Sequence, residues 1–210
     1  MGTYLRDRFR ELAPARDGKM EPVFINCEGT RTYKDEVTGS RWNTGQVTLA
    51  LDLVADFVKI TQTNPTKIAI IAPDEANVVM IGQFLKRPEY SVLAGMGAPA
   101  TVEAFQSREA DIAVAVMGTT RSGKTAGPWS TSDKNRLNVL CSRQRCGLLL
   151  VGDTFVTGRM EDRGEKRKRG SKGHTSFFVN GQKRKKIWMK AGMLRNISIA
   201  DFGRTKRLLR

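Results

Sequence analysis

Four apolar runs constrain the fold of this chain more than any other feature of its sequence. They cover residues 23–27, 67–72, 112–117 and 147–153. Strands that are apolar on both sides are typical of a parallel sheet whose two faces are both buried. Residues 91–93 predict one further short strand. Because helix-forming segments separate the runs, we expect an α/β fold in which helices cover both faces of a mostly parallel sheet.

The segments between the strands predict three helices and one long loop or hairpin. In the first helix, apolar residues recur at helical spacing from Val47 to Val58. Residues 28–43, which precede it, are polar and contain glycine, as is typical of a loop or a hairpin. The first predicted helix begins at Asn43 or Thr44 and ends at Asn64-Pro65. The second begins at Asp74 and ends near Leu85. The third begins at Ser132 or Asp133 and ends near Arg145.

The C-terminal part of the chain is strongly basic. The formal net charge is +15 at pH 7, and residues 154–210 contain 17 Lys or Arg against four Asp or Glu. Clusters at residues 165–172 and 182–186 predict a partly disordered segment that attracts phosphate, directs nuclear import or serves as a solvated linker. We divide the chain into a flexible N-terminus (1–20), a globular domain (21–153) and a basic tail (154–210), and expect nucleic acid as the partner.

The composition also excludes several classes of protein. No apolar run approaches the ~18 residues of a membrane helix, and the N-terminus has no apolar signal segment. The single histidine, His174, argues against a zinc site or a serine-type triad. Three cysteines argue against a disulfide scaffold, and we read Cys141 and Cys146 as small core residues. We expect an intracellular, soluble protein without a metal site, located in the nucleus or the cytoplasm.

Residues 118–125, GTTRSGKT, match the phosphate-loop pattern G-x-x-x-x-G-K-[ST] and follow a predicted strand. In a working loop, backbone N–H groups and Lys124 would hold phosphate, and Thr125 would bind Mg²⁺. The context argues against this function, because Gly127-Pro128 follows where a helix must open, and proline costs about 3 kcal/mol in a helix interior. We read the segment as a flexible loop. A self-sufficient nucleotidase that uses it is an alternative.

Three segments, in order, resemble motifs of the second RecA-like domain of superfamily 1 helicases, in the nonsense-mediated-decay and senataxin-type branch (an AAA helicase-like C-terminal domain). Residues 67–81 (KIAIIAPDEANVVMI) are similar to motif IV, residues 101–116 (TVEAFQSREADIAVAV) to motif V, and residues 133–153 (DKNRLNVLCSRQRCGLLLVGD) to motif VI. Residues 40–47 (SRWNTGQV) resemble the opening of the first helix of that domain. The resemblance covers about residues 22–153 and implies a RecA-like three-layer sandwich.

The resemblance implies nucleotide contacts at four positions. Arg143 occupies the position of the arginine finger, which neutralises charge on the γ-phosphate of ATP held by the first RecA-like domain. Arg136 lies seven residues earlier, two helical turns away, so we expect both arginines on one helix face. Glu109 matches a carboxylate that contacts the nucleotide, and Gln106 matches a residue that links the nucleotide and strand sites. Without the resemblance, Arg143 reads as a solvated helix residue and Glu109 as a turn cap or a partner of Arg108.

The resemblance also implies contacts with nucleic acid. Thr101 occupies a position whose hydroxyl meets a backbone phosphate, and Pro73 marks a strand-contacting turn. Arg145 serves either nucleic acid or a structural ion pair. Trp42 and Trp129 fit either packing or base stacking, and we favour packing.

The chain departs from the family at Ser107, Asp74 and Gln46, which stand where the family has a glycine, an aromatic residue and a glutamate. The first RecA-like domain, which would hold the phosphates of ATP and Mg²⁺, is not in these 210 residues. We therefore expect the second half of an ATP-dependent RNA or DNA helicase. It would bind a single strand, and would use ATP and Mg²⁺ only when a first half, such as a separate helicase N-terminal half, completes it. The alternative is a non-catalytic nucleic-acid-binding protein that uses the RecA-like scaffold and the basic tail.

Overall fold

The computed structural model describes residues 23–27, 29–120 and 134–153 of the chain. At its centre is a five-stranded sheet in the order β1-β7-β6-β4-β5, and every neighbouring pair is parallel. The expected α/β fold with a parallel sheet is thus confirmed. The strands are β1 (Val23–Asn26), β4 (Ile68–Ala72), β5 (Ala100–Thr101), β6 (Ala110–Val116) and β7 (Gln144–Gly152).

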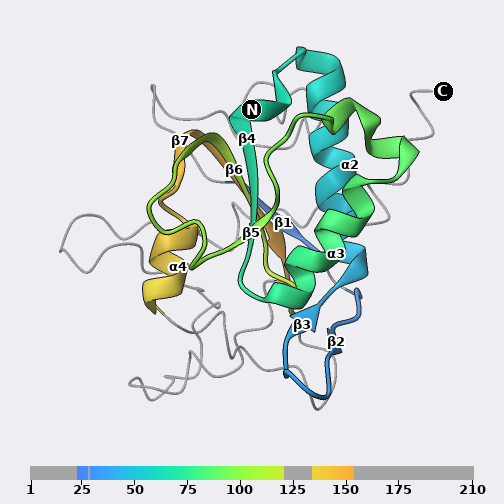
Figure 1. Ribbon diagram of the computed structural model, residues 1–210, viewed down its shortest axis with the longest axis vertical. Helices are drawn as coiled ribbons and strands as arrows, with labels where there is room; N and C mark the ends of the chain where they lie inside the picture. The colour runs from blue at the N-terminus through green and yellow to red at the C-terminus, as the bar shows by residue number, and fades with distance from the viewer. Residues whose placement is uncertain (1–22, 28, 121–133, 154–210) are drawn as a thin grey trace, which may run out of the picture.

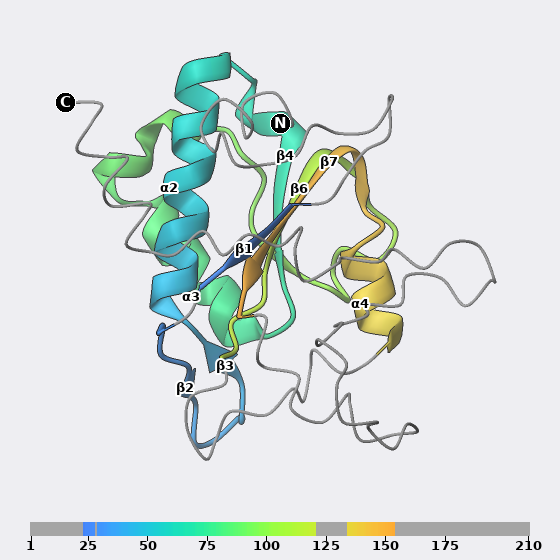
Figure 2. The ribbon, with the colours of Figure 1, turned by 180° about the vertical axis from the view of Figure 1, so that it is seen from behind.

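The central strands bury side chains on both faces of the sheet. In β6, Ile112 and Val114 pack into one hydrophobic core, whereas Ala113 and Ala115 pack into another. This alternation follows because successive side chains of a strand point to opposite faces. Helices α2 (Thr44–Thr61) and α3 (Glu75–Leu85) cover one face, and the shorter α4 (Lys134–Leu140) covers the other (Figure 1 and Figure 2). The result is the expected three-layer, RecA-like sandwich.

Helix α2 begins where the sequence predicts, because Asn43 caps it. The side-chain oxygen of Asn43 accepts a hydrogen bond from the backbone N–H of Gln46 at 3.0 Å. The helix ends before the expected stop at Asn64-Pro65, because Gln62 adopts a left-handed conformation with φ of 55°. A 3-10 helix, η1 (Pro65–Lys67), then leads into β4.

The segment before α2 forms the hairpin that was one of the two predicted alternatives. Its antiparallel strands are β2 (Tyr33–Lys34) and β3 (Arg41–Trp42). Asp35 closes the turn, because its Oδ1 accepts hydrogen bonds from the backbone N–H groups of Val37 and Thr38. These bonds, chiefly those from Thr38, lower the pKa of Asp35. The hairpin lies at the lower end of the molecule in Figure 1, beside the start of α2.

One predicted strand is wrong, and one strand is missing from the prediction. Residues 91–93 belong to a 3-10 helix, η2 (Pro88–Leu93), rather than to a strand. A proline suits the first turn of a helix, where no N–H donor is needed. The missing strand is β5, which exists through its pairing with Ile71 and Ala72 of β4. Two residues are too few to carry a strand pattern of their own.

The helix expected to reach Arg145 is shorter than predicted. Helix α4 ends at Leu140, and β7 already begins at Gln144. Gln144 pairs with Ala110 of β6, so a helix through this position would remove part of the parallel ladder. The cap expected at the start of this helix lies outside the described residues.

Within the described ranges, no helix is long and apolar enough to cross a membrane. The N-terminus (1–20), the tail (154–210) with its two basic clusters, and Trp129 lie outside these ranges. The expectations for them therefore stay predictions.

Candidate functional site

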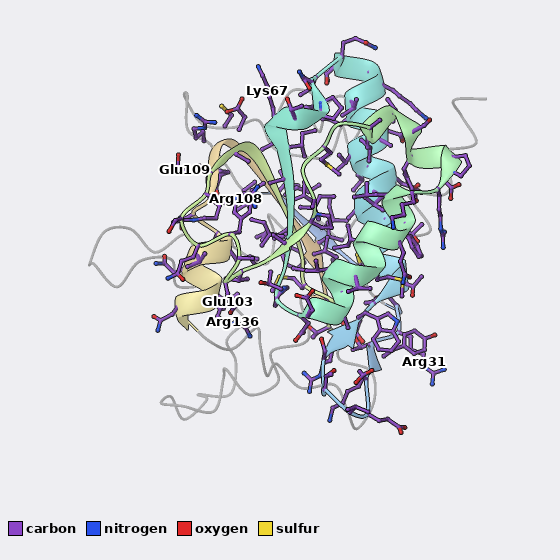
Figure 3. The ribbon with its side chains drawn as sticks, in the orientation of Figure 1. Arg31, Lys67, Glu103, Arg108, Glu109 and Arg136 are labelled. Carbon is purple, nitrogen blue, oxygen red and sulfur yellow. The ribbon has the colours of Figure 1, made fainter. Side chains whose placement is uncertain are left out.

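The segment that follows β5 crosses the face of the sheet that α4 covers. We call residues 101–109 the motif V turn. It begins at Thr101, at the carboxyl end of β5, and ends at Glu109, directly before the amino end of β6. Glu103 and Glu109 accordingly lie at opposite ends of this side of the molecule in Figure 3. The residues that the resemblance assigns to the nucleotide therefore extend across a face, and are not confined to the carboxyl edge where ligands of parallel sheets usually bind.

Arg136 of α4 joins the three helicase-like motifs. Its Nε donates to Oε1 of Glu103 at 2.5 Å, and its Nη2 donates to the carbonyl oxygen of Pro73 at 3.1 Å. The hydrogen bond from Arg136 holds the pKa of Glu103 below its ordinary value. Motif VI is thus tied both to the motif V turn and to the motif IV turn at the end of β4. The resemblance assigns Arg136 to the nucleotide, and the structure places its guanidinium against these two turns.

Arg143 lies between the end of α4 and the start of β7. Its Nη1 donates to the carbonyl oxygen of Gln106 at 2.7 Å, and its Nη2 donates to Oγ of Ser142 at 2.9 Å. Its Nε is buried, and no described residue accepts the Nε hydrogen. The guanidinium therefore rests on the motif V turn, with one buried donor that no described residue uses.

Arg136 and Arg143 contact the same turn although they do not share a helix. Since α4 ends at Leu140, the expectation that both arginines lie on one helix face is wrong. Arg136 nevertheless contacts Glu103, and Arg143 contacts Gln106, three residues further along the turn. Any displacement of either guanidinium would therefore change how this turn is held.

The remaining predicted site residues occupy three different environments. Thr101 is half-buried, and its Oγ1 accepts a hydrogen bond from the N–H of Ala104 at 3.2 Å. Pro73 is buried. Glu109 is exposed. Arg145 is exposed and forms an ion pair with Asp111 of β6, with 3.2 Å between Nε and Oδ1. Its contact with nucleic acid stays a prediction.

A buried polar network at the carboxyl edge escaped the sequence reasoning. Gln46 is fully buried; its Nε2 donates to the carbonyl oxygen of Thr119 at 2.9 Å, and its Oε1 accepts from the N–H of Gly118 at 2.8 Å. Asn77 donates to the carbonyl oxygen of Val116 at 3.1 Å and accepts from the N–H of Asn43 at 3.2 Å. The departure from glutamate to Gln46 was the signal, because an amide both donates and accepts whereas an ionised carboxylate only accepts.

This network bears on the phosphate-loop match at residues 118–125. Gly118 has φ of +74°, and its N–H is already bonded to Gln46. Thr119 and Thr120 are buried, and the hydroxyl of Thr120 lies 3.1 Å from that of Thr32. The first three residues of the match are thus occupied by contacts within the protein. Lys124, Thr125 and the rest of the match lie outside the described residues.

The acidic and cysteine side chains of the described ranges include no group of three or more that could hold a metal ion. Burial raises the pKa of the Cys141 thiol to about 11; burial, with the charge of Asp153, raises that of Cys27 to about 12. Cys146 is exposed, so its expected place in the core is wrong. It lies in the first, solvent-facing part of β7.

Comparison with known proteins agrees with this geometry. A family model described as an AAA domain matches residues 6–155. The regulator of nonsense transcripts 1 of Dictyostelium discoideum is 28% identical over 138 residues, which is 65% of this chain and 10% of that protein. The regulator of nonsense transcripts 1 homolog of Drosophila melanogaster is 32% identical over 99 residues, which is 46% of this chain and 8% of that protein.

The chain thus spans about a tenth of the length of these relatives. The matched region contains the whole described sheet, the motif V turn and both arginines that contact it. With the parallel sheet order and the three motifs in place, the chain belongs to the AAA domain family, in its superfamily 1 helicase-like branch.

Proposed function

We propose that this chain acts as the second RecA-like half of an ATP-dependent helicase on single-stranded RNA or DNA. In this role Arg143 reaches the γ-phosphate of ATP bound by a first half, and Glu109 contacts the nucleotide. A forked cation is suited to this task, because charge spreads over the phosphoryl oxygens in the transition state. The relatives' printed name, regulator of nonsense transcripts, favours RNA as the strand.

The observation that carries the proposal is the shared anchoring of Arg136 and Arg143 on the motif V turn. This turn begins at Thr101, the predicted phosphate contact, and includes Gln106, whose carbonyl oxygen accepts from Arg143. A nucleotide phosphate that attracts the Arg143 guanidinium would compete with that carbonyl oxygen. The turn that contacts the strand would thereby respond to the nucleotide, as a translocating motor requires.

ATP and Mg²⁺ would be held mainly by the first half, and this chain would complete the site. In this division the guanidinium of Arg143, which rests on the motif V turn, would be this chain's cation toward the phosphates. When bound, ATP supplies the phosphoryl group and Mg²⁺ neutralises part of its charge. Arg143, Glu109 and Gln106 would orient the nucleotide, and Thr101 and the Pro73 turn would hold the strand.

The experiment compares ATP hydrolysis by this chain alone with that of a protein in which the first RecA-like half of a superfamily 1 helicase precedes it. We expect strand-stimulated hydrolysis from the joined protein, and none from this chain or the first half alone. Oligouridylate and oligothymidylate of equal length show whether RNA or DNA stimulates. Hydrolysis by the lone chain that Lys124→Ala removes would instead support the nucleotidase alternative.

A second candidate function, a non-catalytic nucleic-acid-binding protein, is favoured by the charge of residues 154–210. It predicts that removing these residues abolishes nearly all affinity for single strands and makes the salt dependence much shallower. The helicase-half proposal expects residual binding through Thr101 and the Pro73 turn. It also expects the joined protein to retain strand stimulation after the tail is removed.

A further inference from the structure

The hairpin beside motif IV presents a pair of stacked aromatic rings at the surface. Tyr33 of β2 pairs with Trp42 of β3, and their ring centroids lie 5.6 Å apart with an interplanar angle of 18°. Tyr33 is 40% exposed. Neither residue belongs to the two hydrophobic cores of the described domain. The packing predicted for Trp42 is therefore a contact with Tyr33 within the hairpin, and not a place in either core.

Two cations, Arg31 and Lys34, lie beside this pair, and the same hairpin carries the exposed carboxylate of Glu36. The guanidinium carbon of Arg31 lies 5.2 Å from the centre of the Tyr33 ring, within the range of a cation–π contact. Lys34, next to Tyr33, is exposed. The nearby carboxylate of Asp35 is directed into its own turn, where Oδ1 accepts hydrogen bonds from Thr38 and Val37. Aromatic rings interleaved with cations are the arrangement on which nucleic-acid bases stack.

The hairpin is held firmly against the body of the domain. Ser40 Oγ accepts a hydrogen bond from the N–H of Ala76 in the first turn of α3, at 2.9 Å. Thr32 donates to the carbonyl oxygen of Gly118 at 3.4 Å. A two-stranded hairpin alone is marginally stable in water, so these contacts fix its position. A surface that is already fixed loses little entropy when a ligand binds.

The position of the hairpin also continues the proposed strand path. Ala76 lies three residues after Pro73, the turn that the proposed function places against the strand. Because Ser40 of the hairpin accepts a hydrogen bond from Ala76, the hairpin lies beside the start of α3, directly after the Pro73 turn. A strand that continued from Thr101 across the Pro73 turn would therefore reach the hairpin. Arg31 marks this end of the molecule at the lower right of Figure 3, across from Glu103 and Arg136.

We propose that Tyr33, Trp42 and Arg31 form a stacking platform that holds a base of the single strand beyond the motif IV turn. This inference rests on the proposed function for the direction of the strand. The chemistry it requires is a π-faced base attached to a phosphate backbone, which RNA and single-stranded DNA both offer. Tyr33 and Trp42 would contact the base, and Arg31 and Lys34 the adjoining phosphates.

The test measures binding of ten-residue oligouridylate, oligothymidylate and an abasic strand of the same length to the full chain by fluorescence anisotropy. The abasic strand keeps the phosphates and lacks the bases, so the affinity ratio reports base contacts alone. Raised salt suppresses the contribution of residues 154–210. We expect Tyr33→Ala to reduce this ratio by about tenfold, and Tyr33→Phe to preserve it, because a phenyl ring still stacks.

Val37→Ala is the matched control, because Val37 is 94% exposed on the same hairpin and belongs to no ring contact. It should leave the ratio unchanged, and circular dichroism should show that all variants fold.

Arg31→Ala should instead make the salt dependence of binding shallower and weaken binding of the abasic strand as well. Equal ratios for the unchanged chain and Tyr33→Ala would overturn the platform, as would a ratio of one for the unchanged chain. Both outcomes leave ATP hydrolysis by the joined protein intact, so a failure of the platform is distinct from a failure of the helicase assignment.

Discussion

The guanidinium of Arg143 is bonded to the carbonyl oxygen of Gln106 at 2.7 Å, which fixes the residue after the motif VI helix to the turn of motif V. The bond links two segments that are far apart in the chain and that the family resemblance assigns to different ligands. A single backbone oxygen thus connects the arginine that we propose contacts the nucleotide with the turn that we propose contacts the strand.

Replacing Gln46 with glutamate should destabilise the domain. A carboxylate can still accept from the N–H of Gly118, but it has no hydrogen to donate to the carbonyl oxygen of Thr119. The loss of a buried hydrogen bond costs about 1–3 kcal/mol. Chemical denaturation of Gln46→Glu should show this loss. Gln83→Glu, the same change at an exposed position of α3, should leave the free energy of unfolding nearly unchanged; equal effects of the two would contradict the role given to Gln46.

The ion pair of Glu103 with Arg136 should make stability depend on pH below the ordinary glutamate pKa of 4.5. The pKa of Glu103 is lowered in the folded protein, so its stabilisation is present above 4.5 and is lost as pH falls through the folded value. Because both side chains are partly exposed, the effect should not exceed about 1 kcal/mol.

Glu103→Gln tests this dependence, with denaturation measured between pH 3 and pH 7. The difference in unfolding free energy from the unchanged chain should be largest near pH 7 and should decrease as pH falls below 4.5. In the background of Arg136→Gln, the same Glu103 change should have no pH-dependent effect. A difference that persists in that background would assign the pH dependence to another partner.

The three cysteines should react with a disulfide reagent at very different rates. Burial raises the pKa of Cys27 and Cys141, to about 12 and about 11, which keeps both as unreactive thiols at pH 8. Cys146 is exposed. Titration with Ellman's reagent should therefore show one fast thiol in the folded chain and three in denaturant. Cys146→Ser should remove the fast reaction, and a fast reaction that survives would mean that the core around Cys27 or Cys141 is open.

The sequence predicts the layers of this fold well, because its long apolar strands leave few alternatives. The run at residues 112–117 corresponds to β6, and the cap at Asn43 marks the start of α2. Short elements are less visible. Residues 91–93 are too few to distinguish a strand from the 3-10 helix that Pro88 begins, and β5 owes its existence to its neighbour β4.

The sequence identifies the residues of the candidate site, but it does not predict how they are arranged in space. The resemblance identifies Arg136 and Arg143, but helical spacing misplaces them relative to each other, because pairing of Gln144 with Ala110 ends the helix early. Their common contact with the motif V turn depends on tertiary structure. The hydrogen bonds of Gln46 to residues 118 and 119 also depend on tertiary structure. Partners more than seventy positions apart in the chain leave no periodic pattern in the sequence.

The proposed function requires that Arg143 completes the ATP site of the joined protein. The most direct measurement is kcat for strand-stimulated ATP hydrolysis by the joined protein carrying Arg143→Ala. Arg87→Ala, which removes an exposed arginine paired with Glu89 and stacked on Phe84, is the control. We predict a loss of at least about a hundredfold for Arg143→Ala, as expected for removal of an arginine finger, and kcat unchanged within about twofold for Arg87→Ala. Equal kcat for the two variants would contradict the account.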